Sequence, residues 1–305
     1  MNKRQIGHTD LYVSELSLGC MSLGTDPNKA KEIIDRALNA GINYLDTADL
    51  YDFGENERIV GEAIKGRRED VLIGTKAGNK FTPGQEGWTW DPSKSHIKSA
   101  VKDSLQRLGI DYIDLYQLHG GTIEDPINET IEAFEDLKSE GLIREYGISS
   151  IRPNVIKEFA EKSNIATVMM QYSALDRRPE ELLGFLEENN ISVLARGPLA
   201  KGMLSSKGQK KVNQKGRDGF LDYSYEELLA TINKWQDYRS DERTLESLAL
   251  QYILHHKSVA TAVFGASSLA QLEDNLSFLE AAPLTEQIFG EMQTLTKELT
   301  YQKHR

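Results

Sequence analysis

Eight short apolar runs alternate with longer amphipathic segments along this chain, and this alternation restricts the possible folds more than any other feature. The runs are apolar at nearly every position rather than at every second one, which is typical of strands buried on both faces of a parallel sheet. We expect strands at Leu16–Gly19, Tyr44–Asp46, Val71–Lys76, Ile113–Leu118, Ile143–Ile148, Thr167–Met170, Ser192–Ala195 and Ala260–Phe264.

The segments between these runs have helical periodicity. Gly41, Gly66, Gly109 and Gly141 follow the first four of them, at the position where glycine commonly ends a helix. Eight strands alternating with helices predict an α/β protein with a (β/α)8 barrel, the TIM barrel. The expected helices are Asn28–Ala40, Asn56–Lys65, Ser93–Leu108, Ile127–Glu140, Arg178–Asn189, Ser224–Tyr238, Glu242–His255 and Ser268–Glu280.

Three segments lie outside this repeat. Residues 3–15 predict a β-hairpin before the first strand, 197–223 form a long loop after the seventh strand, and 283–305 predict a C-terminal helix and tail. A chain of 305 residues could also form two domains. No linker-like stretch divides it, so we expect one barrel domain over residues 1–305.

Composition limits the partners and the compartment. The formal net charge of −11 argues against nucleic acid or an anionic membrane as the main partner. Cys20 is the only cysteine, so no intrachain disulfide can form, and we expect a reducing, cytoplasmic setting. The first seven residues contain no long apolar segment that would indicate a signal peptide. No apolar run approaches the ~18–20 residues needed to span a bilayer.

Ionisable residues stand at the ends of three successive predicted strands. Asp46 ends the second, Lys76 ends the third and His119 follows the fourth, while Tyr51 lies five residues past Asp46. The carboxyl ends of parallel strands open onto one rim of a barrel. We therefore expect these four side chains to meet there.

This set of residues can turn a tyrosine into a proton donor. A free tyrosine has a pKa near ~10, too high for a ready acid at neutral pH, and a nearby ammonium lowers it. Lys76 can supply the ammonium, Asp46 can hold it in place, and His119 can hydrogen-bond the substrate oxygen. Each residue also has a structural interpretation: Asp46 and Lys76 as an ion pair, Tyr51 as an aromatic residue at the rim, and His119 as a packed histidine. Their joint spacing favours catalysis.

Sequence motifs extend this pattern along nearly the whole chain. Asp46–Tyr51 reads Asp-Thr-Ala-Asp-Leu-Tyr, and Gly147–Ser150, Gln171–Ser173, Gly197–Gly202 and Gly265–Asn275 follow in order. Together they resemble the aldo-keto reductase superfamily, particularly a bacterial branch similar to the potassium-channel β subunits. The resemblance implies reduction of aldehydes and ketones with NADP(H), with Tyr51 as the general acid and no metal.

The resemblance also implies a set of cofactor-binding residues. Ser149, Ser150 and Gln171 would hydrogen-bond the nicotinamide carboxamide, although the family often has asparagine where Ser150 stands. The other expected cofactor contacts are Gly19, Cys20, Met21, Asp46, Arg196, Gly197, Pro198, Leu199, Lys201, Gly202, Gly265, Ser267, Gln271, Asp274 and Asn275.

Two departures from the family pattern concern charge. Arg196 stands where many relatives have an aromatic residue; it could stack on the nicotinamide and repel its oxidised, cationic form, or it could pair with a nearby acid. Ser267, Ser268 and Gln271 occupy the adenosine-phosphate segment, which usually has a basic residue. Five basic residues without an acid lie in 207–217. They could attract a polyanionic cofactor or belong to a solvated loop.

The substrate is less well determined than the reaction. Phe53, Trp88 and Trp90 lie in predicted rim loops, where they could form an aromatic wall for a small carbonyl compound or anchor those loops. We expect reduction of a broad range of aldehydes. Two alternatives remain open: an NADP(H)-binding regulatory or redox-sensing subunit with little turnover, and an isomerase or aldolase on the same barrel. The sequence does not specify the oligomeric state.

Overall fold

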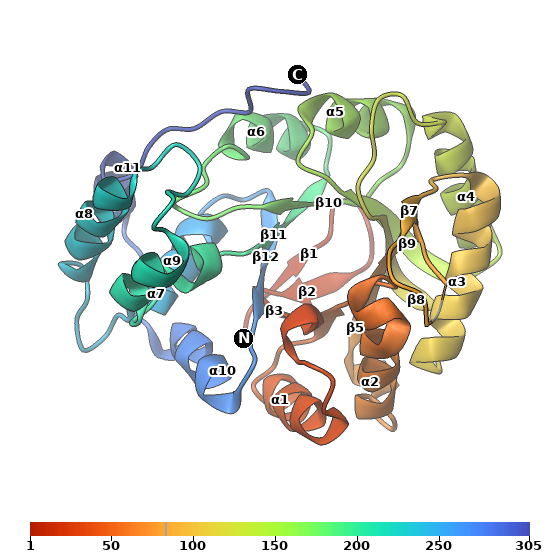
Figure 1. The fold of residues 1–305 in the computed structure, drawn as a ribbon, viewed down its shortest axis with the longest axis horizontal. Helices are drawn as coiled ribbons and strands as arrows, with labels where there is room; N and C mark the ends of the chain where they lie inside the picture. Colours follow the sequence, from red (N-terminus) through yellow and green to blue (C-terminus); the bar gives the residue numbers. More distant parts are fainter. Residues whose placement is uncertain (83) are drawn as a thin grey trace.

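Eight parallel strands form a closed barrel in the computed structural model, which describes residues 1–82 and 84–305 (Figure 1). Their order around the barrel is β10-β11-β12-β3-β4-β5-β8-β9. Every predicted barrel strand is confirmed to within one residue at each end. The barrel strands are β3 Leu16–Gly19, β4 Tyr44–Asp46, β5 Leu72–Ala77, β8 Ile113–Leu118, β9 Ile143–Ser149, β10 Thr167–Gln171, β11 Ser192–Arg196 and β12 Val259–Gly265.

Helices form a ring around this barrel. The eight predicted helices and the predicted C-terminal helix, α11, are present. Two helices that were not predicted join them: α5, between β9 and β10, and α7, within the segment expected to be a long loop. The helices are α1 Pro27–Asn39, α2 Glu55–Ala63, α3 Lys94–Leu108, α4 Ile127–Ser139, α5 Pro153–Lys162, α6 Glu180–Glu188, α7 Gly208–Lys215, α8 Tyr225–Gln236, α9 Leu245–Leu254, α10 Leu269–Leu276 and α11 Glu286–Thr294. None of the helices in the described part of the chain is both long and apolar enough to cross a membrane.

The predicted N-terminal hairpin closes the amino-terminal end of the barrel. Its strands β1 (Lys3–Gln5) and β2 (Tyr12–Ser14) pair antiparallel. Ile6, Leu11 and Val13 are almost fully buried, and they pack in one cluster with residues of the barrel interior such as Tyr44 and Leu115. The hairpin therefore completes the hydrophobic core at the amino-terminal end of the barrel.

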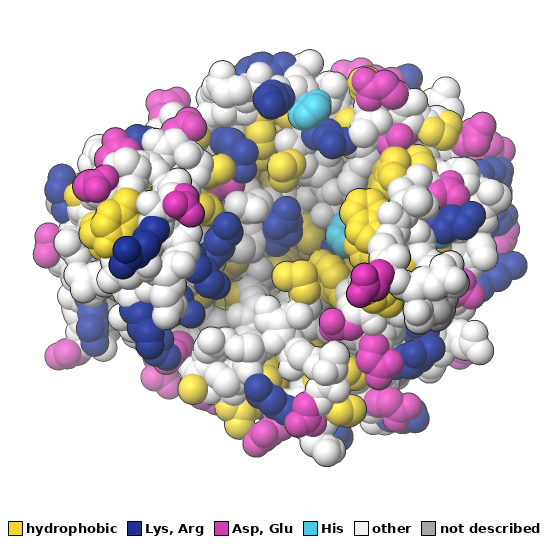
Figure 2. Space-filling model, in the orientation of Figure 1, with side chains coloured by type: hydrophobic (Ala, Val, Ile, Leu, Met, Phe, Trp, Pro, Cys, Tyr) yellow, Lys and Arg dark blue, Asp and Glu magenta, His cyan; other side chains and the backbone are white. Residues whose placement is uncertain are grey.

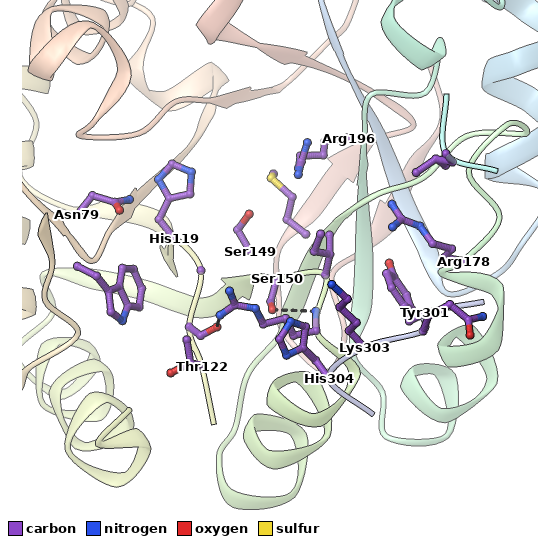
Figure 3. A pocket seen from close by; sticks show the side chains of 18 of the residues that line it. Asn79, His119, Thr122, Ser149, Ser150, Arg178, Arg196, Tyr301, Lys303 and His304 are labelled. Atoms are coloured by element: carbon purple, nitrogen blue, oxygen red, sulfur yellow. Dashed lines mark hydrogen bonds between the residues drawn. The ribbon is translucent and has the colours of Figure 1, made fainter. Parts of the chain in front are cut away.

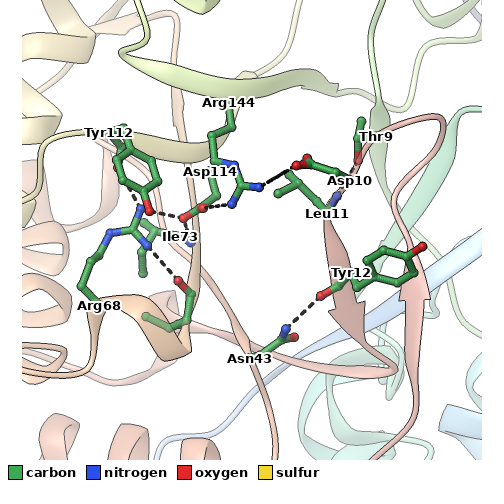
Figure 4. A network of polar contacts seen from close by, with 11 residues as sticks. Thr9, Asp10, Leu11, Tyr12, Asn43, Arg68, Ile73, Tyr112, Asp114 and Arg144 are labelled. Carbon is green, nitrogen blue, oxygen red and sulfur yellow. Dashed lines mark hydrogen bonds and ion pairs between the residues drawn. The ribbon is translucent and has the colours of Figure 1, made fainter.

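A polar network ties this hairpin to the strands (Figure 4). The buried carboxylate of Asp114 accepts hydrogen bonds from Arg68 Nη2 at 2.8 Å, Arg144 Nη1 at 3.1 Å and the backbone N–H of Ile73 at 2.8 Å. Arg144 also contacts Asp10 of the hairpin turn at 3.3 Å. Asp114 is thus a buried charge with two cationic partners.

Two further excursions lie at the carboxyl-terminal rim. A short hairpin of β6 (Asn79–Lys80) and β7 (Thr89–Trp90) follows β5. After α11, residues 295–305 run without regular secondary structure across the rim, and the C-terminus lies beside α5 in Figure 1. The backbone N–H of Asn154, in α5, donates to the carbonyl of His304 at 2.8 Å, so the tail is held in place close to its end.

Candidate active site

Three neighbouring strands bring together the four residues predicted to be catalytic. Asp46 is the last residue of β4, Lys76 lies one residue before the end of β5, and His119 directly follows β8. Tyr51 begins a short 3-10 helix, Tyr51–Gly54, after β4. Because β4, β5 and β8 are adjacent in the barrel, the four side chains converge at one rim.

Lys76 and Asp46 form a buried ion pair. Lys76 Nζ lies 2.7 Å from Asp46 Oδ2 and also donates to the carbonyl of Thr47 at 2.6 Å. The Lys76 side chain is 1% exposed and the Asp46 side chain 6%. Burial alone would lower the pKa of Lys76, but the attraction of Asp46 and of Tyr51 outweighs this and raises it. Lys76 is therefore a fixed cation at neutral pH.

Tyr51 stands between this cation and His119. Lys76 Nζ lies 5.2 Å from the centroid of the Tyr51 ring, and the rings of Tyr51 and His119 meet edge to face with centroids 5.8 Å apart. Burial lowers the pKa of His119 to about 3, assisted by the positive charges of Lys76 and Arg196. His119 is consequently neutral at neutral pH and offers one N–H donor and one acceptor nitrogen.

A cavity of about 1000 Å³ opens above these residues (Figure 3). The predicted site residues that line it are Met21, Tyr51, Trp88, Trp90, His119, Ser149, Ser150 and Arg196. Asn79, Thr122, Arg152 and Arg178 also line it, as do residues 299–304 of the tail. Sequence reasoning missed this second group. The tail carries no strand or helix pattern that would place it at the rim.

Phe53 was predicted to contact the substrate and Cys20 the cofactor, but neither side chain lines this cavity. Phe53 is absent from the cavity lining, and its ring packs edge to face on Phe81 with centroids 5.6 Å apart. Phe53 is 41% exposed, so it stands at the outside of the rim. The Cys20 side chain is fully buried. Trp90 belongs to β7 rather than to a loop, and its Nε1 donates to both carboxylate oxygens of Asp125 at 3.0 Å.

The remaining predicted cofactor residues follow the same rim around the barrel. Gly19 is in register with both Gly265 and Asp46, and Gln171 is in register with Arg196. Gln171 accepts a hydrogen bond from Arg196 Nη1 at 3.4 Å and donates to Asp176 at 3.1 Å. Arg196 makes no ion pair with an acid in the described part of the chain.

The loop after β11 and the start of α10 extend this rim. Gly197 and Gly202 have positive φ angles of 68° and 85°, a backbone conformation that favours glycine. A Cβ atom at Gly197 would meet only Gln171 Cγ, at 3.8 Å, so the side of the loop that it would point to is open. Pro198, Leu199 and Lys201 complete this loop.

At α10, Gln271 Oε1 accepts hydrogen bonds from the backbone N–H and the hydroxyl of Ser267, at 2.8 and 2.9 Å. Lys207, just before α7, lies 3.5 Å from Asp274 of α10. The Oδ1 atom of the buried Asn275 has no hydrogen-bond partner among the described residues. It can therefore accept a hydrogen bond from a bound amine. Most of the basic segment thus forms α7, which packs against α8, rather than a free loop.

Taken together, the geometry provides a phenol beside a fixed cation and a neutral imidazole, under a cavity sized for a small molecule. This arrangement suits proton transfer to an oxygen atom held between Tyr51 and His119. No group of three or more His, Cys, Asp or Glu side chains placed to hold a metal ion occurs in residues 1–82 or 84–305.

Comparison with known proteins agrees with this geometry. Residues 15–297 match the family model described as "Aldo/keto reductase family". The chain is 56% identical over 306 residues to the uncharacterized oxidoreductase YqkF of Bacillus subtilis, covering 100% of both chains. It is 33% identical to the NADH-specific methylglyoxal reductase of Escherichia coli, covering 92% of this chain and 94% of that one.

Solved structures give the same result. The holo form of aldo-keto reductase AKR11C1 from Bacillus halodurans superposes with a TM-score of 0.93 at 56% identity, covering 100% of this chain and 99% of that one. The apo form, with 53% identity and the same coverage, has a TM-score of 0.85. The present fold is therefore closer to the holo form.

Proposed function

Since the chain belongs to the aldo/keto reductase family, we propose that it reduces aldehydes and ketones to alcohols with NADPH, and that Tyr51 is the general acid. The observation that carries this proposal is the pair of Tyr51 and His119, which line one cavity, with the buried Lys76–Asp46 ion pair beside Tyr51. When bound, the cofactor supplies a hydride to the carbonyl carbon.

In this proposal, the residues of the chain manage the carbonyl oxygen. Neutral His119 donates a hydrogen bond that orients the carbonyl, and the Tyr51 hydroxyl gives up its proton as negative charge develops on that oxygen. Lys76 stabilises the phenolate that results, because an adjacent ammonium favours the charged form of tyrosine. Asp46 acts through Lys76, which it holds within 2.7 Å, and is therefore a positioning residue.

The residues along the rim from β9 to α10 fit a nicotinamide dinucleotide. Ser149 and Ser150 line the cavity, with Gln171 and Arg196 on the neighbouring strands, and they would hold the nicotinamide. The open side of Gly197 leaves room for a phosphate near the backbone. The unpartnered Oδ1 of Asn275 could accept the adenine amino group.

We propose NADPH rather than NADH as the preferred cofactor. Ser267 and Gln271 stand at the start of α10, where hydroxyl and amide donors and the helix N-terminus favour an anionic phosphate. The NADH-specific relative from Escherichia coli is 33% identical, so cofactor preference has to be measured on this chain.

The decisive experiment follows NADPH consumption at 340 nm with 4-nitrobenzaldehyde, with NADH and the Tyr51→Phe variant run in parallel. We expect consumption that prefers NADPH and falls by at least about 100-fold in the variant, while NADPH affinity, read from fluorescence quenching, stays nearly intact. NADPH binding without consumption would refute a reductase with a broad range of aldehydes and would favour a regulatory subunit or an enzyme with a very narrow substrate range. Consumption that favours NADH would refute the cofactor assignment alone.

A further inference from the structure

The active-site cavity carries positive charges besides Arg196, the one assigned to the nicotinamide. Arg152, Arg178 and Lys303 also line it, against a single acid, Asp222. The chain as a whole has 47 acidic and 36 basic residues, so this wall reverses the overall balance. Figure 2 shows Lys and Arg side chains gathered within and along the central hollow of this face.

Most of these cations are not neutralised by the protein. Arg178 is paired, because its guanidinium donates two hydrogen bonds of 2.7 Å to Asp176. Arg152, Arg196 and Lys303 form no ion pair within 4 Å among residues 1–82 and 84–305. Arg152 donates instead to the backbone carbonyl of Gly121. A neutral acceptor of this kind fixes the guanidinium in place without cancelling its charge.

Lys303 is held on the cavity wall by the packing of the tail. The next residue, His304, accepts a hydrogen bond from the backbone of Asn154 at 2.8 Å. Two residues before Lys303, Tyr301 is 4% exposed, and its ring centroid lies 5.0 Å from the Arg178 guanidinium carbon. Figure 3 shows Lys303 and His304 across the cavity from Asn79 and His119.

These charges lie apart from the segments expected to bind the cofactor phosphates. Arg152 follows β9. One strand, β10, separates β9 from β11 and the Gly197 loop, and two strands, β10 and β11, separate it from β12 and α10. Lys303 stands on the same side, since the tail is bonded to α5, the helix that follows β9. The anionic groups of a dinucleotide along the Gly197 loop, β12 and α10 would therefore leave Arg152 and Lys303 without a partner.

We infer that this cavity selects carbonyl compounds that carry a negatively charged group, such as a carboxylate, at the end remote from the carbonyl. His119 and Tyr51 bind the carbonyl end, and Arg152 and Lys303 bind the anionic end. This inference rests on the proposed function, because it names the class of substrate for the same site. A planar guanidinium and an ammonium are the side chains best suited to bind a carboxylate.

The test compares kcat/KM for 4-carboxybenzaldehyde with that for its neutral methyl ester, methyl 4-formylbenzoate. We use the ratio of the two values in each variant, because intrinsic reactivity then cancels between variants. The ratio should fall roughly tenfold or more in Lys303→Glu and in Arg152→Gln, the effect of losing one hydrogen bond to a charged group. Lys102→Glu changes the net charge equally on the exposed face of α3 and should leave the ratio unchanged.

A ratio that is the same in the wild type, Lys303→Glu and Lys102→Glu would overturn the inference. So would a ratio insensitive to salt, because an exposed charge contact weakens between 50 and 500 mM salt at a Debye length of roughly 14 to 4 Å. Turnover of 4-nitrobenzaldehyde by the wild type distinguishes failure of the proposed reductase function from failure of the proposed substrate class. If that neutral substrate is reduced while the ratio is unaffected, the reductase function stands and only the substrate class is refuted.

Discussion

Replacement of Lys76 by methionine measures how much the buried ion pair beneath Tyr51 contributes to stability. The partners are 1% and 6% exposed, so the 0–1 kcal/mol typical of a surface pair does not apply. Methionine nearly fills the same space but leaves the Asp46 carboxylate and the Thr47 carbonyl without their donor. The remaining contact of Asp46, from Tyr44 Oη at 3.5 Å, is too long to replace it. We expect the free energy of unfolding to fall by about 3–5 kcal/mol.

Urea denaturation followed by far-UV circular dichroism at pH 7.5 gives this free energy. The double variant Lys76→Met/Asp46→Leu removes both charges and should be less destabilised than the sum of the two single variants by at least about 1 kcal/mol. Lys65→Met is the matched control, since Lys65 contacts Glu62 at 2.7 Å with both side chains at least 66% exposed. Its cost should stay below about 1 kcal/mol. Equal losses for Lys76→Met and Lys65→Met would refute the reasoning.

Three further predictions concern pH, the base of the barrel and the cofactor. The pKa of His119 is about 3 in the folded chain against 6.5 normally, so below pH 6.5 the unfolded state binds a proton that the folded state does not. The free energy of unfolding should therefore drop by about 2 kcal/mol from this residue as the pH falls to 5. Urea titrations of His119→Gln should lack that pH-dependent loss. Asp114→Ala should lower the free energy of unfolding, measured by thermal unfolding, by about 3–5 kcal/mol, because two arginines and a backbone N–H lose their acceptor. KM should not change, because these groups lie far from the cavity. Asp10→Ala is the control: the Asp10 side chain is 82% exposed, so the loss should be less than about 1 kcal/mol. Arg196→Tyr should strengthen NADP+ binding relative to NADPH roughly fivefold in fluorescence titrations, since two cations ~4 Å apart in water repel by about 1 kcal/mol.

Each of these has a result that contradicts it. An unchanged pH dependence in His119→Gln would mean that the imidazole is not kept neutral by the fold. Equal losses of unfolding free energy in Asp114→Ala and Asp10→Ala would mean that burial does not strengthen the contacts of Asp114 in the network of Figure 4. An unchanged affinity ratio in Arg196→Tyr would show that the guanidinium does not sense the charge of the ring.

The sequence predicted the barrel well because its strands are continuous apolar runs bounded by turn residues. It also predicted the Tyr51 cluster, since Asp46, Lys76 and His119 are tied to strand ends. Helix α5 was not predicted, although Pro153 at its start is a common signal for the beginning of a helix. The cavity wall from Arg152 to the tail was missed for a different reason. Its residues gather through contacts between distant segments, such as Asn154 with His304, and these leave no local pattern.

The docked tail has a practical consequence for handling the protein. Residues 299–304 line the cavity, so a purification tag or partner domain fused after Arg305 would emerge at its mouth. Met1 lies instead beside Gly41, which precedes β4 at the opposite end of the barrel. An N-terminal fusion therefore leaves the substrate entrance unobstructed. Kinetic constants measured with a C-terminal fusion would include the cost of moving that extension aside.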